Sequence, residues 1–252
     1  MKPIHERRTF FLFCLAISVT KVTAQLKLNG METGINTGAM IYQGDLTPSK
    51  PGSYKTPGFG INLYAAKPLS NNFYLRVNFA LGKLKGEDAK YNNPLWRQQR
   101  NFNFKTPVAE LTGNMVWYPL GNNDYNNGRR LAPYITGGAG LSLLKIKRNW
   151  NQLNTETFSG EPNFFTGLSI DQAHSLPGVT PIIPIGAGLS YSLSPKISLV
   201  TEASYRFLFT DYLDGFSHSV DPSKKDAYYS LSVGVKYSFR KKDGIGCPTI
   251  KF

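Results

Sequence analysis

The feature that most constrains the fold is an alternation of apolar and polar residues that recurs in eight segments. In FYLRVNFALGK, residues 73–83, the odd positions up to 81 carry Phe, Leu or Val, whereas the even positions carry Tyr, Arg, Asn, Ala or Gly. A period of two predicts a β-strand with one apolar face. The segments lie at 33–43, 58–67, 73–83, 108–118, 132–144, 182–193, 197–207 and 228–239. No sustained helical stripe accompanies them, so the sequence predicts an all-β fold.

Two architectures use such strands in opposite ways. A soluble barrel or sandwich turns the apolar face inward, whereas a transmembrane barrel turns it toward lipid and keeps a polar interior. Most segments are about 10 to 12 residues long, which matches the roughly 9 to 11 residues that a tilted strand needs to cross a bilayer. We therefore predict an eight-stranded antiparallel transmembrane β-barrel of small, OmpA-like size.

Aromatic residues gather near the segment ends, as interfacial girdles do in membrane barrels. We assign one group to each rim: Tyr64, Tyr74, Trp117, Tyr118, Tyr134, Tyr191 and Tyr237 to one, and Tyr42, Phe59, Phe207, Phe209 and Tyr229 to the other. The last segment ends in Tyr237 and Phe239, which we interpret as the signal read by the outer-membrane insertion machinery.

The two ends of the chain predict export and a short tail. A basic start, an apolar run of about ten residues and the small-residue site Val22-Thr23-Ala24 indicate a signal peptide at 1–24, cleaved near Ala24. The barrel would then occupy 25–239, and 240–252 would form a periplasmic C-terminal tail. We therefore expect the protein in the cell outer membrane.

The connections between the segments alternate between long and short. Those at 44–57, 84–107, 145–181 and 208–227 are long, whereas those at 68–72 and 194–196 are short turns. Long external loops and short periplasmic turns are typical of outer-membrane barrels. The Asn/Gly-rich stretch PLGNNDYNNGRR, residues 119–130, is longer than a usual periplasmic turn.

Five charged side chains point into the predicted bore by parity: Arg76, Glu110, Glu202, Arg206 and Lys236. The bore of an eight-stranded barrel is just wide enough for side chains to fill. We interpret these residues as an ionic network that plugs the bore, in preference to a proton or solute path, because both signs of charge are present.

The formal net charge is +13, but the basic residues are scattered, so we expect contact with outer-membrane lipid and no nucleic acid. Of the two cysteines, only Cys247 lies beyond the signal peptide. In the tail, Arg240, Lys241, Lys242 and Cys247 could contact a periplasmic partner. The alternatives are basic residues that meet lipid headgroups and a plain unpaired thiol.

Candidate catalytic groups are few. His174-Ser175 and His218-Ser219 fall in expected external loops, and no His/Cys cluster of zinc-binding spacing occurs. The stretch RFLFTDYLDGFS places Asp211 and Asp214 three residues apart among aromatics. We interpret it as the point where a strand becomes an external loop, with Asp211 capping a turn by accepting backbone N–H groups. The sequence therefore predicts neither an enzyme, a metal site nor a bound cofactor.

Four stretches carry a family resemblance: GINTGAMIYQGDL, RNFNFKTPVAELTGNMVWYPL, PYITGGAGL and TDYLDGFS. In order and spacing they resemble the PorG-like outer-membrane barrels of Bacteroidota. This resemblance implies a structural or anchoring component of a type IX-like secretion system that contacts a periplasmic ring built from a lipoprotein and its partner. Two alternatives stay open: a small barrel whose external loops bind a ligand or surface partner, and a lipid hydrolase at the barrel rim.

Overall fold

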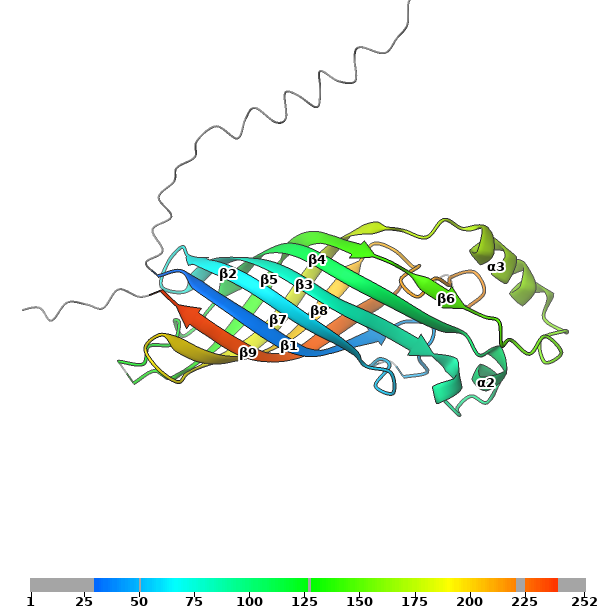
Figure 1. Cartoon of the computed structure of the whole chain (residues 1–252), viewed down its shortest axis with the longest axis horizontal. Coiled ribbons are helices and arrows are strands. Elements are labelled where there is room, and N and C mark those ends of the chain that lie inside the picture. The colour runs from blue at the N-terminus through cyan, green and yellow to red at the C-terminus, as the bar shows by residue number, and fades with distance from the viewer. Residues whose placement is uncertain (1–29, 50, 127, 221–224, 240–252) are drawn as a thin grey trace, which may run out of the picture.

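Eight antiparallel strands close a barrel, which Figure 1 shows from the side. The computed structural model describes residues 30–49, 51–126, 128–220 and 225–239. The barrel strands are β1 (Glu32–Gln43), β2 (Gly58–Pro68), β3 (Phe73–Glu87), β4 (Asn103–Trp117), β5 (Leu131–Leu144), β7 (Val179–Ser192), β8 (Ile197–Leu208) and β9 (Ala227–Ser238). The ring closes because β3 pairs with both β2 and β4. The predicted eight-stranded antiparallel barrel is confirmed.

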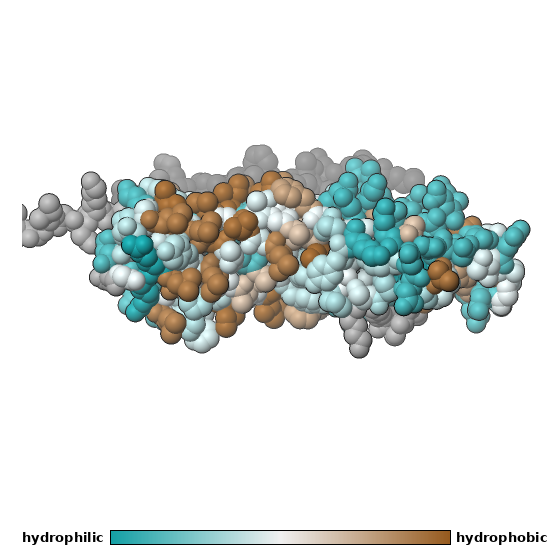
Figure 2. Space-filling view, turned by 90° about the horizontal axis from the view of Figure 1, so that it is seen from below, coloured by the Kyte–Doolittle hydropathy of each residue, from teal (hydrophilic) through white to brown (hydrophobic). Residues whose placement is uncertain are grey.

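The outward side chains form an apolar belt around the barrel. Val77 on β3 and Leu111 on β4 are 52% and 58% exposed, and every barrel strand contributes exposed large apolar residues of this kind. Figure 2 shows the belt over one part of the molecule and a hydrophilic surface over the other. An exposed apolar belt around a polar interior is the arrangement of a transmembrane barrel, because lipid is the solvent that covers such a surface.

The two ends of the barrel differ in their connections. The short connections 69–72 and 193–196 lie at the end where β1 begins and β9 finishes, together with the longer turn 118–130. At this end the Gly30 N–H donates to the Phe239 carbonyl. The long connections, 44–57, 88–102, 145–178 and 209–226, lie at the opposite end (Figure 1). Short turns face the periplasm in bacterial barrels, so the long connections are external. We call the described residues of these four connections the external cap.

The external cap contains short helices that no sustained helical stripe marks in the sequence. It holds the 3-10 helix η1 (Asp88–Lys90), the short helix α2 (Trp96–Arg100), the strand β6 (Lys147–Asn149) and the helix α3 (Pro162–Ala173). The periodicity of α3 is weak, because its apolar residues do not form one stripe, although Pro162 occupies a position that favours a helix start. Among the described residues, no helix is long and apolar enough to cross a membrane.

Four tyrosines predicted at a rim lie inside the bore instead. Tyr64, Tyr74, Tyr118 and Tyr134 are at most 8% exposed. Three of them have inward parity on their strands, and Tyr118 directly follows β4 with the same parity. Glycines leave room for two of the rings. A Cβ at Gly34 would meet the Tyr64 ring at 2.3 Å, and one at Gly188 would meet the Tyr134 ring at 2.4 Å. Trp117, Tyr191 and Tyr237 do face outward, as predicted, whereas Tyr42 is fully buried.

The belt predicts a strong penalty for charge at its centre. Val77 lies midway along the exposed apolar positions of β3, so Val77→Arg should lower the free energy of unfolding by about 2–4 kcal/mol. Leu120 lies in the connection 118–130, at the periplasmic end of the barrel, and is 64% exposed outside the strands. Leu120→Arg should therefore change the free energy of unfolding little. Urea unfolding in lipid vesicles measures both values, and equal effects would contradict the membrane belt.

Candidate functional site

The structure places all five predicted bore residues inside the barrel and joins four of them in two ion pairs. Arg76 Nη1 lies 2.7 Å from Glu202 Oε2, and Arg206 Nε lies 3.3 Å from Glu110 Oε2. The fifth, Lys236, pairs with Glu32 at 3.0 Å. All six side chains are at most 10% exposed, so each charge depends on its partner.

Neutral polar groups complete the coordination of the two central pairs. Tyr134 donates its hydroxyl proton to Glu202 at 2.8 Å, and Tyr228 donates to Glu110 at 2.6 Å. Two small cavities beside these groups measure about 30 Å³ and about 10 Å³. Such volumes hold on the order of one or two waters, so this part of the bore is filled by side chains.

The long periplasmic turn closes the inner mouth of the bore. Asn122 donates to Glu32 and to the Tyr74 hydroxyl, both at 2.8 Å, while Asn123 donates to Ser190 and Ser198. The ammonium of Lys236 donates to both asparagine side-chain oxygens. The unusual length of residues 119–130 therefore has a structural reason: the turn folds back into the barrel.

Glu32 is a bore residue that sequence reasoning missed. It lies one position before the predicted start of the first strand, and the structure extends β1 to include it. Extending the alternation backward from Gly34 by two residues gives Glu32 inward parity, so the signal was present in the pattern.

The predicted contact and insertion residues divide between described and undescribed parts of the chain. Arg240, Lys241, Lys242 and Cys247 lie outside the described residues, as does the signal peptide at 1–24. Tyr237 is 37% exposed at the inner end of β9, and its ring packs edge-on against Phe239 at 4.9 Å.

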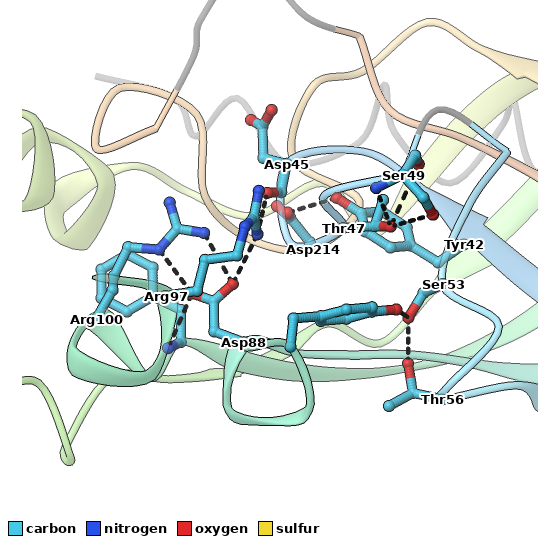
Figure 3. Close-up of polar contacts among 12 residues, drawn as sticks. Tyr42, Asp45, Thr47, Ser49, Ser53, Thr56, Asp88, Arg97, Arg100 and Asp214 are labelled. Carbon is cyan, nitrogen blue, oxygen red and sulfur yellow. Dashed lines mark hydrogen bonds and ion pairs between the residues drawn. The ribbon is translucent and has the colours of Figure 1, made fainter. Parts of the chain in front are cut away.

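Three buried aspartates hold the external cap together, and sequence reasoning missed all three. The first, Asp88, is fully buried and accepts from Arg97 at 2.9 Å and from Arg100 at 2.6 and 3.0 Å (Figure 3). Arg97 also donates to the Asp45 carbonyl, which links the second external connection to the first. No periodic pattern marks these aspartates in the sequence, because their partners lie in irregular connections or, for Asp171 and Asp226, in segments far away in the sequence.

The second, Asp171, joins α3 to the last external connection. It accepts the backbone N–H groups of Ser217, His218 and Ser219, and the hydroxyl of Ser219 at 2.6 Å. The ring of His174 stacks on Tyr212 with 3.9 Å between centroids. Ser219 is thus bonded to a carboxylate in a structural contact, which differs from the Ser–His contact that activates a nucleophile.

The third, Asp226, shares the Tyr42 hydroxyl with Asp214. The hydroxyl oxygen lies 2.6 Å from Asp214 Oδ2 and 2.8 Å from Asp226 Oδ1. A hydroxyl has one proton to donate, so one of these short contacts requires a proton on a carboxyl group. Burial raises the pKa of Asp214 to about 8, and burial together with the Asp214 charge raises the pKa of Asp226.

In the stretch RFLFTDYLDGFS, Asp211 was predicted to cap the turn, and the structure shows Asp214 in a capping contact. Asp214 Oδ1 accepts the backbone N–H of Phe216 at 2.8 Å, whereas Asp211 accepts the Ser217 hydroxyl. Asp214 is fully buried and so has the more constrained geometry. β8 does end at Leu208, so the stretch does begin the last external connection. Within the described residues, no group of three or more His, Cys, Asp or Glu side chains is arranged to hold a metal ion.

The central ion pair should show strong coupling. Arg76→Leu leaves Glu202 buried without its cation and should cost about 3–5 kcal/mol of unfolding free energy. Adding Glu202→Leu removes the stranded charge, so the double variant should be more stable than the Arg76→Leu variant. A double-mutant cycle by urea unfolding in vesicles measures this, and additive costs would contradict the pairing.

The external cap should lose stability as pH rises. The folded-state pKa of Asp214 lies above its unfolded value, so the folded state binds more protons between these values. The stabilising contribution of protonated Asp214 is therefore fully present below about pH 4 and is lost as the pH rises through about 8. Hydrogen exchange of cap amides at pH 5 and pH 9 should reveal the loss. Asp214→Asn should weaken this dependence, whereas Glu156→Gln, at an exposed carboxylate, should keep it.

Several solved barrels resemble the structure. Ail of Yersinia pestis, in complex with the heparin analogue sucrose octasulfate, is 13% identical, with a TM-score of 0.43 over 83% of this chain and 98% of that one. Neisserial surface protein A is 14% identical, with a TM-score of 0.44 over 84% and 98%. OprG from Pseudomonas aeruginosa is 12% identical, with a TM-score of 0.43 over 84% and 97%. Because the identities and TM-scores are this low, the assignment of a barrel depends on the strand pairing of the chain itself.

The sequence comparisons give a family without a described activity. No curated protein matches the chain. A family model described as "Domain of unknown function (DUF6089)" matches residues 7–240, which include every barrel strand and the whole external cap. The chain therefore belongs to the DUF6089 family, and its described fold is that of an outer-membrane β-barrel.

Proposed function

We propose that this protein is an interaction subunit of the outer membrane that binds a ligand or surface partner through its external cap. The observation that carries the proposal is the construction of the cap. Buried Asp171 joins the third connection to the last, and Asp226 joins the last connection to Tyr42 on β1. Arg97, which Asp88 holds, joins the second connection to the first. Loops on a rigid scaffold are the usual location of binding residues. A fixed arrangement reduces the entropy cost of binding.

The bore supports binding over transport. Its central charges are paired, its inner mouth is occupied by Asn122 and Asn123, and the cavities beside the ion pairs are water-sized. A diffusion channel needs a continuous polar lumen, which larger barrels provide. In this account the barrel is an anchor that holds the cap at the cell surface.

The chemistry of the cap supports a function other than catalysis. Ser219 donates to Asp171, and His174 stacks on Tyr212, so these two of the residues considered for a rim hydrolase serve the packing of the cap. A hydrolase would need a nucleophile bonded to a base that a third group orients. We therefore propose a non-enzymatic role.

A second candidate is the one that the PorG-like resemblance implies: an anchoring subunit of a type IX-like secretion complex that contacts a periplasmic ring lipoprotein. The observation in its favour is the inner rim, where the ordered turn borders a polar cavity of about 570 Å³ lined by Asn71, Asn122, Asp124 and Arg129 among others. Such a surface could receive a periplasmic protein. The tail at 240–252, with Cys247, would add to this contact.

Site-specific photo-crosslinking in living cells separates the two candidates. Leu95 and Ile170 are 71% and 44% exposed in the external cap, and Leu69 and Leu120 are 55% and 64% exposed at the inner rim. A photoreactive residue at Leu95 or Ile170 should give a discrete adduct with a surface partner or glycan, because the cap is the binding face.

Adducts at Leu69 or Leu120 alone, with a periplasmic lipoprotein and lost on deletion of 240–252, would contradict the external proposal and support the secretion candidate. The barrel should fold in both sets of variants, because all four positions are exposed outside the barrel strands. Heat-modifiable migration on gels provides the check of folding.

A further inference from the structure

All four external connections meet around one cavity of about 590 Å³. Asp45 comes from the first connection, Arg97 from α2 in the second, Phe164 from α3 in the third, and Ser219 from the last. The volume falls within the range of roughly 300–1,000 Å³ that is typical of small-ligand sites. The buried aspartates described above hold the segments that line it, so its walls are fixed by the cap itself.

Aromatic faces form part of the wall. Trp96 lines the cavity and is 42% exposed, although it lies in the external cap and outside the apolar belt. Phe158 and Phe164 stack at 4.7 Å between centroids and line the cavity together. Aromatic faces carry partial negative charge and attract the C–H groups of a ring placed over them. The guanidinium groups of Arg97 and Arg100 lie 5.1 and 4.9 Å from the centroid of the Trp96 ring, and the part of the ring that stays exposed can meet a ligand with an apolar face.

The polar part of the wall contains an unsatisfied donor. Arg97 is 8% exposed, and its Nη1 donates to Asp45 and Asp88. Its Nε is buried and has no hydrogen-bond partner among the described residues. A buried donor without an acceptor costs about 1–3 kcal/mol, so Arg97 keeps hydrogen-bonding capacity that the described residues do not use.

The charges of the wall decide the ligand class. Arg97 and Arg100 share Asp88 as their counter-ion, and Asp45 and Glu161 also line the cavity. The two carboxylates oppose an anionic ligand, and the two guanidinium groups oppose a cationic one. What remains is a ligand without net charge that both donates and accepts hydrogen bonds, which the mixed lining of acids, guanidinium groups and hydroxyls can match.

We infer that this cavity is a binding site for a neutral saccharide of one to a few sugar rings. The C–H face of a pyranose ring would stack on Trp96, and its hydroxyls would accept from Arg97 and donate to Glu161. This inference rests on the proposed external binding function and specifies its ligand. Glycans are the chemistry that an external face of a cell envelope meets.

Binding to the purified full-length protein in nanodiscs tests the inference. The probes are neutral trisaccharides of glucose, galactose, mannose and N-acetylglucosamine, with a glucuronate trisaccharide and choline as charged comparisons. Calorimetry should detect binding of at least one neutral probe and little binding of the charged ones. Trp96→Ala should weaken that binding at least tenfold, whereas Phe209→Ala, at an aromatic residue that is 65% exposed and not in the cavity lining, should stay within twofold.

A second variant protects the test against misfolding. Glu161 is exposed, so Glu161→Gln should fold normally and weaken neutral-saccharide binding about threefold or more. Failure of the whole neutral panel, stronger binding of a charged probe, or binding insensitive to both variants would each overturn the inference. If Leu95 or Ile170 still gave an adduct with a surface protein, the saccharide inference alone would fail and external binding would stand.

Discussion

The structure depends on the pairing of charges inside a space too narrow for bulk water. Each barrel strand alternates its side chains, so a strand that presents an apolar row to lipid must present its other row to the bore. Arg76, Glu202, Arg206 and Glu110 meet there at hydrogen-bonding distance, and tyrosine hydroxyls satisfy their remaining acceptors. An unpaired charge at this depth would cost several kcal/mol, so the pairs constrain strand register as well as charge.

Because side chains fill the bore, binding surfaces can form only at the two ends of the barrel. At the inner end, Asn122 and Asn123 extend the polar network from Lys236 and Glu32 into a turn. At the outer end, the interior becomes apolar: Tyr42, Phe102, Phe104, Leu213 and Phe216 belong to one buried cluster that strands and cap build together. The cap is therefore a packed continuation of the barrel, and its connections are held by hydrophobic contacts as well as by buried aspartates.

Features set by residues close together in the sequence were predicted well, whereas features set by contacts between distant residues were not. Strand positions, facing directions and the loop alternation followed from residues that are neighbours in the sequence, and the structure agrees with them. The girdle assignment went wrong for four tyrosines, Tyr64 and Tyr134 among them, because closeness to a strand end was given more weight than parity. The helix α3 was missed because no amphipathic stripe marks it, and its position depends on Asp171 contacts more than 40 residues away.

The sequence by itself determined that the chain is a barrel, which face of each strand meets lipid, and which charges enter the bore. The physical reason is that side-chain direction along a strand repeats every two residues, so it is a local property. Only the tertiary structure decided that Lys236 pairs with Glu32, that a periplasmic turn closes the bore, and that four connections enclose a cavity beside Arg97. These contacts join segments far apart in the chain, and their geometry exists only once the ring of strands has closed.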